Sequence, residues 1–169
     1  MEEKFSHAEE PESVRNLQFQ TKQDLSSPAS GKSFADFNLS QLKGKNTFGK
    51  EEKLKSQKII DQLFSEGKSV SKNGFTLVYL FKEVPTFYPA QAAFSCPKRN
   101  YKHAVDRNRA KRLMREVYRH HKYPLYEKLV AAKKQLALMW IYKGKQLPDL
   151  AFAQKSMTEC LEKLAERLA

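Results

Sequence analysis

Residues 104–122 read Ala-Val-Asp-Arg-Asn-Arg-Ala-Lys-Arg-Leu-Met-Arg-Glu-Val-Tyr-Arg-His-His-Lys, and they carry the clearest structural pattern in the chain. From Asp106 to about Lys122 it contains no glycine or proline and its apolar residues recur at helical spacing, which predicts a long helix. At about 100° per residue, one face of that helix collects the apolar side chains Ala110, Leu113, Met114, Val117 and Tyr118. Such a face predicts that the helix packs against a core.

The opposite face of the same helix is cationic. The helical wheel places on it Asn108, Lys111, Arg112, Arg115, Arg119 and Lys122. Residues 98–122 contain ten Lys and Arg against two acidic residues, a local net charge of +8 in 25 residues. A merely solvated face usually intersperses Glu with Lys, because like charges at i,i+4 spacing repel. A stripe of one sign favours a phosphate backbone as its ligand, since the guanidinium group makes bidentate contacts with phosphate.

The whole chain is basic, but its charge is unevenly distributed. Its 169 residues carry a formal net charge of +12 at pH 7, of which residues 1–46 contribute −1 and residues 47–169 contribute +13. The first segment is rich in Ser, Gln, Glu and Asn, which predicts a disordered N-terminal extension. Within it, Phe34, Phe37 and Leu39 are close enough together to form a short docking motif. The basic remainder predicts one domain with a polyanionic partner, nucleic acid first and an acidic membrane surface second.

The pattern around the central helix predicts an α+β fold. The other expected elements are a short helix between Ser56 and Gly67, adjacent strands at 75–82 and 90–96, a helix at about 125–132 after Pro124, a doubly buried strand at 136–142 and a last helix opened by Pro148-Asp149. This order predicts a small two-layer sandwich with helices packed against one sheet. No stretch is apolar enough to span a membrane and no signal peptide is recognisable, so we expect a cytoplasmic protein.

The sequence contains no recognisable catalytic or metal site of its own. Cys96 and Cys160 lack the paired spacing of a zinc site, and His103, His120 and His121 form no HxxxH pair. Neither a Ser/His/Asp or Cys/His combination nor a Gly-rich phosphate loop can be identified. We therefore expect no catalytic residue and no metal ligand in this chain.

The residues around the central helix resemble a known family. The run 104–116, with Arg107-Asn108-Arg109 at its centre, is similar to the RNR signature of the bacterial ribonuclease P protein component. Further matches follow in the same order: Lys53-Leu54-Lys55, Leu63-Phe64, Gly67-Lys68-Ser69-Val70, Phe94-Ser95-Cys96-Pro97-Lys98-Arg99, the strand at 136–142 and the last helix. The resemblance covers roughly residues 47–168. This sequence departs from the family in its N-terminal extension, in Ile60 at a position that is often aromatic, and at residues 100–103, where the loop is longer and lacks a glycine.

The resemblance implies both a fold and a function. The fold would be a central mixed sheet with a left-handed βαβ crossover, related to a domain of a small-subunit ribosomal protein, although the general rule favours the opposite hand. The function would be that of the protein subunit of ribonuclease P, which binds the catalytic RNA and the 5′ leader of precursor tRNA and so promotes removal of the leader. The RNA would carry the chemistry and bind most of the Mg²⁺. The expected partners are that RNA, in a 1:1 complex, and precursor tRNA, with no DNA and no membrane.

Charge and resemblance together select the candidate site residues. The expected RNA-binding residues are Lys98, Arg99, Lys102, Arg107, Asn108, Arg109, Lys111, Arg112, Arg115 and Arg119. The candidates for contacting the leader are Ile60, Phe64 and Tyr79. Arg107 and Arg109 are expected to clamp RNA with Asn108 or to fix the loop at 100–103. The alternatives are a ribosomal-type protein that binds structured RNA without taking part in cleavage, and a membrane-surface protein that uses the basic amphipathic helix.

Overall fold

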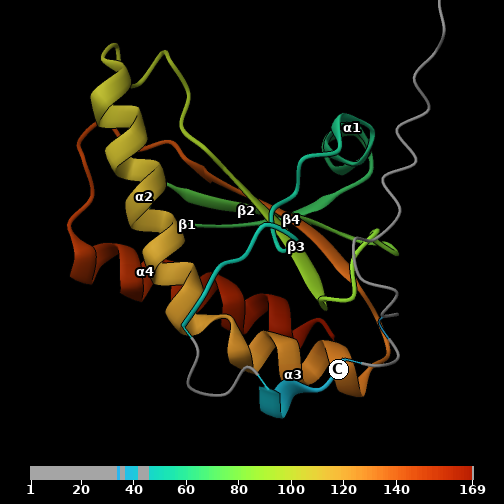
Figure 1. The fold of residues 1–169 in the computed structure, drawn as a ribbon. Helices are drawn as coiled ribbons and strands as arrows, with labels where there is room; N and C mark the ends of the chain where they lie inside the picture. The colour runs from blue at the N-terminus through green and yellow to red at the C-terminus, as the bar shows by residue number, and fades with distance from the viewer. Residues whose placement is uncertain (1–33, 35–36, 42–45, 169) are drawn as a thin grey trace, which may run out of the picture.

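A four-stranded mixed sheet, in the order β1-β2-β4-β3, forms the centre of the fold (Figure 1). The strands are β1 (Lys68–Lys72), β2 (Phe75–Phe81), β3 (Ala90–Ser95) and β4 (Leu136–Tyr142). β2 pairs antiparallel with both β1 and β4, whereas β3 pairs with β4 in parallel. The computed structural model describes Phe34, residues 37–41 and residues 46–168.

β4 is the central strand, as its sequence predicts. It is apolar throughout because both of its faces are covered: Leu138 and Trp140 lie in one core cluster, while Ala137 and Met139 lie in another. One expectation about the sheet is wrong. The strands at 75–82 and 90–96 are not adjacent, because β4 lies between them.

β1 is not predicted from the sequence because it is a polar edge strand. It reads Lys-Ser-Val-Ser-Lys, and Val70 is its buried residue. The turn to β2 is made by Asn73 and Gly74, which have φ angles of 48° and 83°. Both residues tolerate positive φ, so this pair suits the tight turn of a β-hairpin.

Helices cover both faces of the sheet. α2 (Ala104–His121), α3 (Tyr123–Ala131) and α4 (Leu150–Glu166) lie on one face, and α1 (Gln57–Ser65) lies on the other (Figure 1). The α+β sandwich of the sequence analysis is confirmed, with α1 as an addition to its second face. None of the described helices has the length and apolar character needed to cross a membrane.

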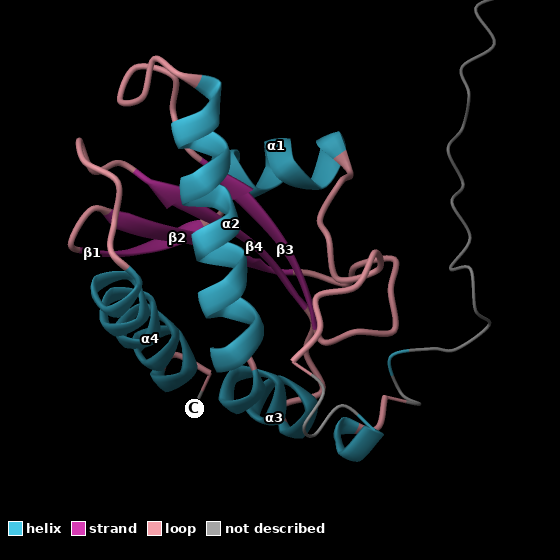
Figure 2. Cartoon of the chain, turned by 60° about the vertical axis from the view of Figure 1, so that its left-hand side comes forward, coloured by secondary structure: helices cyan, strands magenta, loops and turns pink. Residues whose placement is uncertain are grey.

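α2 buries the face that its periodicity predicts. Ala110, Met114, Val117 and Tyr118 are buried, whereas Leu113 is only partly covered at the edge of the core. Figure 2 shows the helix lying across the sheet beside α4. α2 ends at His121, and Pro124 falls in the first turn of α3, where its missing N–H leaves no hydrogen bond unmade.

The described part of the N-terminal segment packs on this helical layer. Phe37 is 7% exposed, and its ring lies 5.6 Å from Phe87, 5.8 Å from Tyr88 and 6.4 Å from Tyr126 between centroids. Phe34 and Leu39 pack around the same core, which is the docking motif that the sequence suggests. The rest of the proposed extension, residues 1–33, 35–36 and 42–45, lies outside the described residues.

We predict that Phe37→Ala lowers the stability of the domain. Removing a buried Phe ring forfeits about 1.5–3 kcal/mol of apolar burial, which a urea titration followed by far-UV circular dichroism would measure. The matched control is Phe64→Ala, because Phe64 is 56% exposed and its loss should change the free energy of unfolding little. Equal stability of the two variants would contradict docking of the segment.

Candidate nucleic-acid interface

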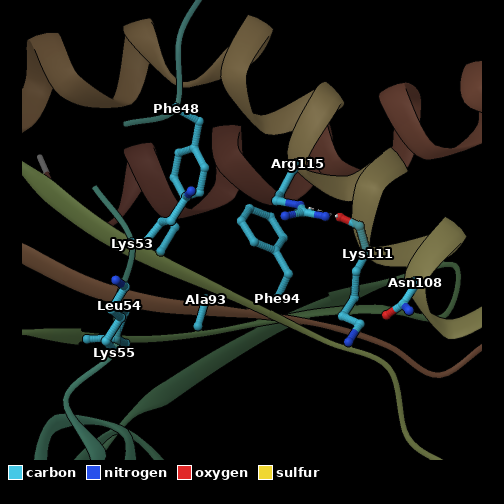
Figure 3. Close-up of a pocket in the computed structure, with 10 residues that line it drawn as sticks. Phe48, Lys53, Leu54, Lys55, Ala93, Phe94, Asn108, Lys111 and Arg115 are labelled. Atoms are coloured by element: carbon cyan, nitrogen blue, oxygen red, sulfur yellow. Dashed lines mark hydrogen bonds between the residues drawn. The ribbon is translucent and has the colours of Figure 1, made fainter. Parts of the chain in front are cut away.

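A groove with a volume of about 410 Å³ lies between α2, the edge of β3 and residues 48–55 (Figure 3). β3 is an edge strand, and its outer side is paired at Ala92, whose N–H donates to the Glu52 carbonyl at 2.8 Å and whose carbonyl accepts from the Leu54 N–H at 3.0 Å. Beyond Ala92, the groove exposes Phe94 of the same strand. The groove therefore exists because the pairing on this edge stops early.

Two aromatic rings form a wall of the groove. Phe48 and Phe94 meet edge to face, with centroids 5.6 Å apart and an interplanar angle of 83°. Both rings rest on the buried ring of Tyr118, at 5.7 and 5.8 Å respectively. Both remain partly exposed, so they offer apolar faces to a ligand on a rigid support.

Positive charge lines both sides of these rings. Asn108, Lys111 and Arg115 project from α2 at i, i+3 and i+7, and Lys53 and Lys55 project from the segment opposite (Figure 3). The Arg115 side chain donates through Nε to the Lys111 carbonyl at 3.2 Å. Among the described residues that line the groove, none is acidic. Cations beside aromatic faces suit a single-stranded nucleic acid.

The remaining predicted cations lie outside the groove. Arg109 and Arg112 are exposed on α2, and Lys98, Arg99 and Lys102 are exposed in the loop that precedes it. Among the residues that the structure describes, no carboxylate forms an ion pair with any of these five. They form a charged surface that is free to meet phosphate.

Arg107 fixes the lengthened loop, which is one of the two roles expected for it. Its guanidinium donates to the carbonyls of Tyr101 at 2.8 Å and Lys102 at 2.7 Å. The other side of the loop is tied to the residues after β4, because the Asn100 amide donates to the Lys143 carbonyl and the Tyr101 hydroxyl donates to the Gln146 carbonyl. The loop is thus anchored at Asn100, Tyr101 and Lys102, within the charge cluster formed by Lys98, Arg99 and Lys102.

Two cations of the predicted stripe are engaged within the protein. The Arg119 Nε donates to a carboxylate oxygen of Glu116 at 2.7 Å, and this contact lowers the pKa of the Glu116 carboxyl. The Arg119 guanidinium also donates to the Asn46 carbonyl at 2.6 Å. Lys122 is fully buried and pairs with the buried Glu52. Burial lowers the pKa of Lys122, and the Glu52 carboxylate opposes that shift. The helical wheel misplaces Lys122 because it cannot show that Thr47 and Glu52 cover this end of α2.

None of the leader candidates chosen from sequence lines the groove. Phe64 and Ile60 belong to α1, on the other face of the sheet. Tyr79 is 1% exposed, and its hydroxyl accepts a hydrogen bond from Arg167 at 2.9 Å, so it is a core residue and cannot stack on a base. Sequence reasoning does not select the aromatic residues of the groove, Phe48 and Phe94. Strand alternation could have placed Phe94 on the side of the sheet that α2 covers. The contact between Phe94 and Phe48 can be recognised only from the tertiary structure.

The fold and this interface define a small, basic, nucleic-acid-binding α+β protein. The family model described as Ribonuclease P matches residues 48–165. A ribonuclease P protein component of Chlorobium phaeobacteroides is 31% identical over 129 residues, which cover 70% of this chain and 88% of that protein. One from Porphyromonas gingivalis is 30% identical over 121 residues, with the same coverage. The chain belongs to the ribonuclease P protein family.

Solved structures agree with this fold. The RNase P protein of Staphylococcus aureus superposes with a TM-score of 0.55 at 20% identity, covering 68% of this chain and 96% of that one. The RNase P protein of Thermotoga maritima gives a TM-score of 0.52 at 18% identity, covering 66% and 96%. At these identities the structures support the shared architecture.

The buried phenols beneath the groove predict alkaline sensitivity. Burial raises the pKa of Tyr118 above the ordinary 10.0. In the folded state this phenol keeps a proton that the unfolded chain releases, so its stabilising contribution is complete below pH 10 and is lost as the pH rises above it. Tyr118→Phe should therefore reduce the fall in unfolding free energy between about pH 9 and about pH 11 by about 1.4 kcal/mol in total. Urea titrations from about pH 9 to about pH 11 would measure this fall, and an unchanged fall would refute the prediction.

Proposed function

We propose that the exposed cations of α2 and of the loop before it hold the catalytic RNA of ribonuclease P, while the aromatic groove holds the single-stranded 5′ leader of precursor tRNA. As a member of its family, the chain is the protein subunit of this endoribonuclease; it binds RNA and takes part in precursor tRNA processing. The observation that carries the finer assignment is the position of Phe48 and Phe94 between two rows of cations. Family membership does not favour a purely ribosomal-type role.

The groove suits an unpaired strand better than a duplex. Bases of a single strand can leave their stack and lie on aromatic side chains, which contributes about 1–3 kcal/mol per base. Phe48 and Phe94 are partly exposed and can make this contact. Lys53 and Lys111 lie beside the two rings, within reach of the phosphates of an RNA strand whose bases stack there. Asn108 both donates and accepts hydrogen bonds, so it can contact a ribose 2′-hydroxyl and favour RNA over DNA.

The exposed cations suit a folded RNA with a dense phosphate surface. Arg109 and Arg112 on α2 and the cluster Lys98–Lys102 form one continuous run in sequence with the RNR signature. Arg107 acts here through the loop that it holds, and Arg119 contributes less because Glu116 already neutralises it. We place one copy of the protein on each RNA, in the cytoplasm, with residues 47–169 as the RNA-binding domain.

The described residues do not fit a Mg²⁺ site of their own. They bring together no group of three His, Cys, Asp or Glu side chains that could hold a metal ion. Mg²⁺ prefers carboxylate and phosphate oxygens and keeps several waters. We propose that the RNA subunit holds the Mg²⁺ of the holoenzyme and carries the chemistry.

We predict that Phe94→Ala weakens binding of precursor tRNA only when a leader is present to occupy the groove. Holoenzyme reconstituted with the variant should lose about fivefold or more in affinity for a substrate with a leader of several nucleotides, because one base can no longer stack. A substrate with a one-nucleotide leader should bind as it does to the wild type. Phe64→Ala is the matched control. Equal losses for both substrates would refute the assignment of the groove to the leader.

We predict that Arg112→Ala reduces the salt dependence of binding to the catalytic RNA. Removing one contact between a cation and a phosphate lowers the log-log slope by about 0.7–0.9, whereas Arg119→Ala should lower it less because of the Glu116 pair. Lys155→Ala, an exposed charge on α4, controls for net charge. Filter binding over a range of salt concentrations gives the slopes. If Arg112→Ala and Lys155→Ala leave the same slope, the α2 surface does not bind the phosphates.

A further inference from the structure

The helical layer encloses an ion pair that stability alone does not explain. The side chains of Glu52 and Lys122 are 1% and 0% exposed, and they are bonded to each other. Removing two charges from water is costly, and a pair of well-packed apolar residues often stabilises a protein equally well or better. The role of this buried pair is therefore to be found in the groups that its hydrogen bonds hold in place.

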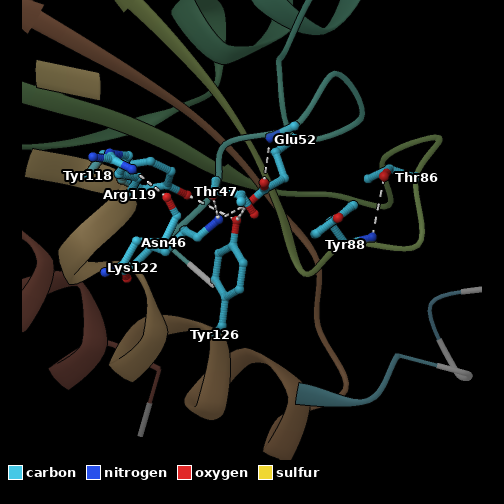
Figure 4. A network of polar contacts seen from close by, with 10 residues as sticks. Asn46, Thr47, Glu52, Thr86, Tyr88, Tyr118, Arg119, Lys122 and Tyr126 are labelled. Carbon is cyan, nitrogen blue, oxygen red and sulfur yellow. Dashed lines mark hydrogen bonds and ion pairs between the residues drawn. The ribbon is translucent and has the colours of Figure 1, made fainter. Parts of the chain in front are cut away.

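Both members of the pair bind backbone groups next to Phe48 (Figure 4). The Lys122 ammonium donates to the carbonyl of Thr47 at 2.6 Å, and the Glu52 carboxylate accepts the N–H of Gly49 at 2.8 Å. The residues on either side of Phe48 are thus held from within the protein. The Tyr126 hydroxyl also donates to Glu52 at 2.8 Å, which fixes the carboxylate against α3.

Other hydrogen bonds hold the two ends of the same segment. Arg119 binds the carbonyl of Asn46, and the Glu52 carbonyl pairs with Ala92 at the edge of β3. Between these points the chain arches over Tyr118 and presents the Phe48 ring to Phe94.

We propose that the Glu52–Lys122 pair is a positioning device that fixes Phe48 as one wall of the groove, so that the aromatic surface is already formed before the leader binds. This inference rests on the proposed function of the groove. A Phe48 ring that is already ordered favours binding, because immobilising a mobile side chain costs entropy and so lowers the affinity gained from its contact. Glu52 and Lys122 touch no RNA in this scheme, and they act through Phe48.

The first test separates positioning from stability. The double variant Glu52→Gln/Lys122→Met removes both charges and the ammonium donor to Thr47 but keeps side chains of similar shape. The carboxamide oxygen that it introduces at position 52 can still accept from Tyr126, so we expect it to fold. In reconstituted holoenzyme it should bind a precursor tRNA with a leader of several nucleotides about fivefold more weakly than the wild type, and a one-nucleotide-leader substrate equally well. Adding Phe48→Ala to it should cause no further loss, because coupled residues are not additive.

A second pair of variants leaves the buried charges untouched. Gly49→Pro deletes the N–H that Glu52 accepts, while Gly49→Ala keeps it, and a Cβ at this position would meet only the Glu52 carboxylate, at an ordinary 3.8 Å. Gly49→Pro should weaken binding of the long-leader substrate, and Gly49→Ala should not. These variants decide the matter if the double variant does not fold.

The outcomes distinguish this inference from the proposal beneath it. If Phe48→Ala alone has no leader-dependent effect, the groove is not the leader site and both ideas fail. If Phe48→Ala weakens long-leader binding but the double variant and Gly49→Pro bind like the wild type, the groove stands and the positioning role is overturned. Equal loss for the two substrates in the double variant, together with a lower melting temperature, would also overturn it by showing a purely structural role.

Discussion

α2 must bury one face against the core while its other face carries a large excess of positive charge, and the packing of this helix organises the layer around it. Burial of Met114, Val117 and Tyr118 contributes about 1.5–3 kcal/mol for each large side chain. Repulsion between like charges at i,i+4 spacing costs only about 0.2–0.5 kcal/mol per pair. The apolar face therefore outweighs the charged one, and the helix keeps its shape without RNA.

Positive charge in this chain serves three different purposes, which only the structure separates. Arg112 faces solvent, Arg107 holds a loop by its backbone carbonyls, and Lys122 is enclosed with Glu52. All three lie within or beside the same cationic run of sequence. A count of cations identifies the class of partner, but the hydrogen bonds of each side chain determine whether it can meet that partner.

Periodicity is the reason that much of the fold could be predicted, and its absence is the reason that the groove could not. The 3.6-residue repeat of α2 and the unbroken apolar run of β4 each specify an element and its buried face, and both are seen. Phe48, Phe94 and Arg115 come from a loop, an edge strand and a helix, and no periodicity links them. The alternation of side chains along β2 predicts that one face of the strand is buried. It does not predict that α4 covers the face that carries Tyr79, which is why the sequence leaves Tyr79 open to interpretation as an RNA contact.

The place of β4 between β2 and β3 has a consequence for how this protein is made. β2 and β3 emerge early from the ribosome, yet their common partner is separated from them by α2 and α3 and ends only at Tyr142. The nascent chain therefore cannot complete its sheet progressively, and such non-local pairing slows folding. α2 packs on β3, which precedes it, and on α4, which is made last of the described elements. α2 is therefore fully packed only after α4, which follows β4 in the chain, has been made.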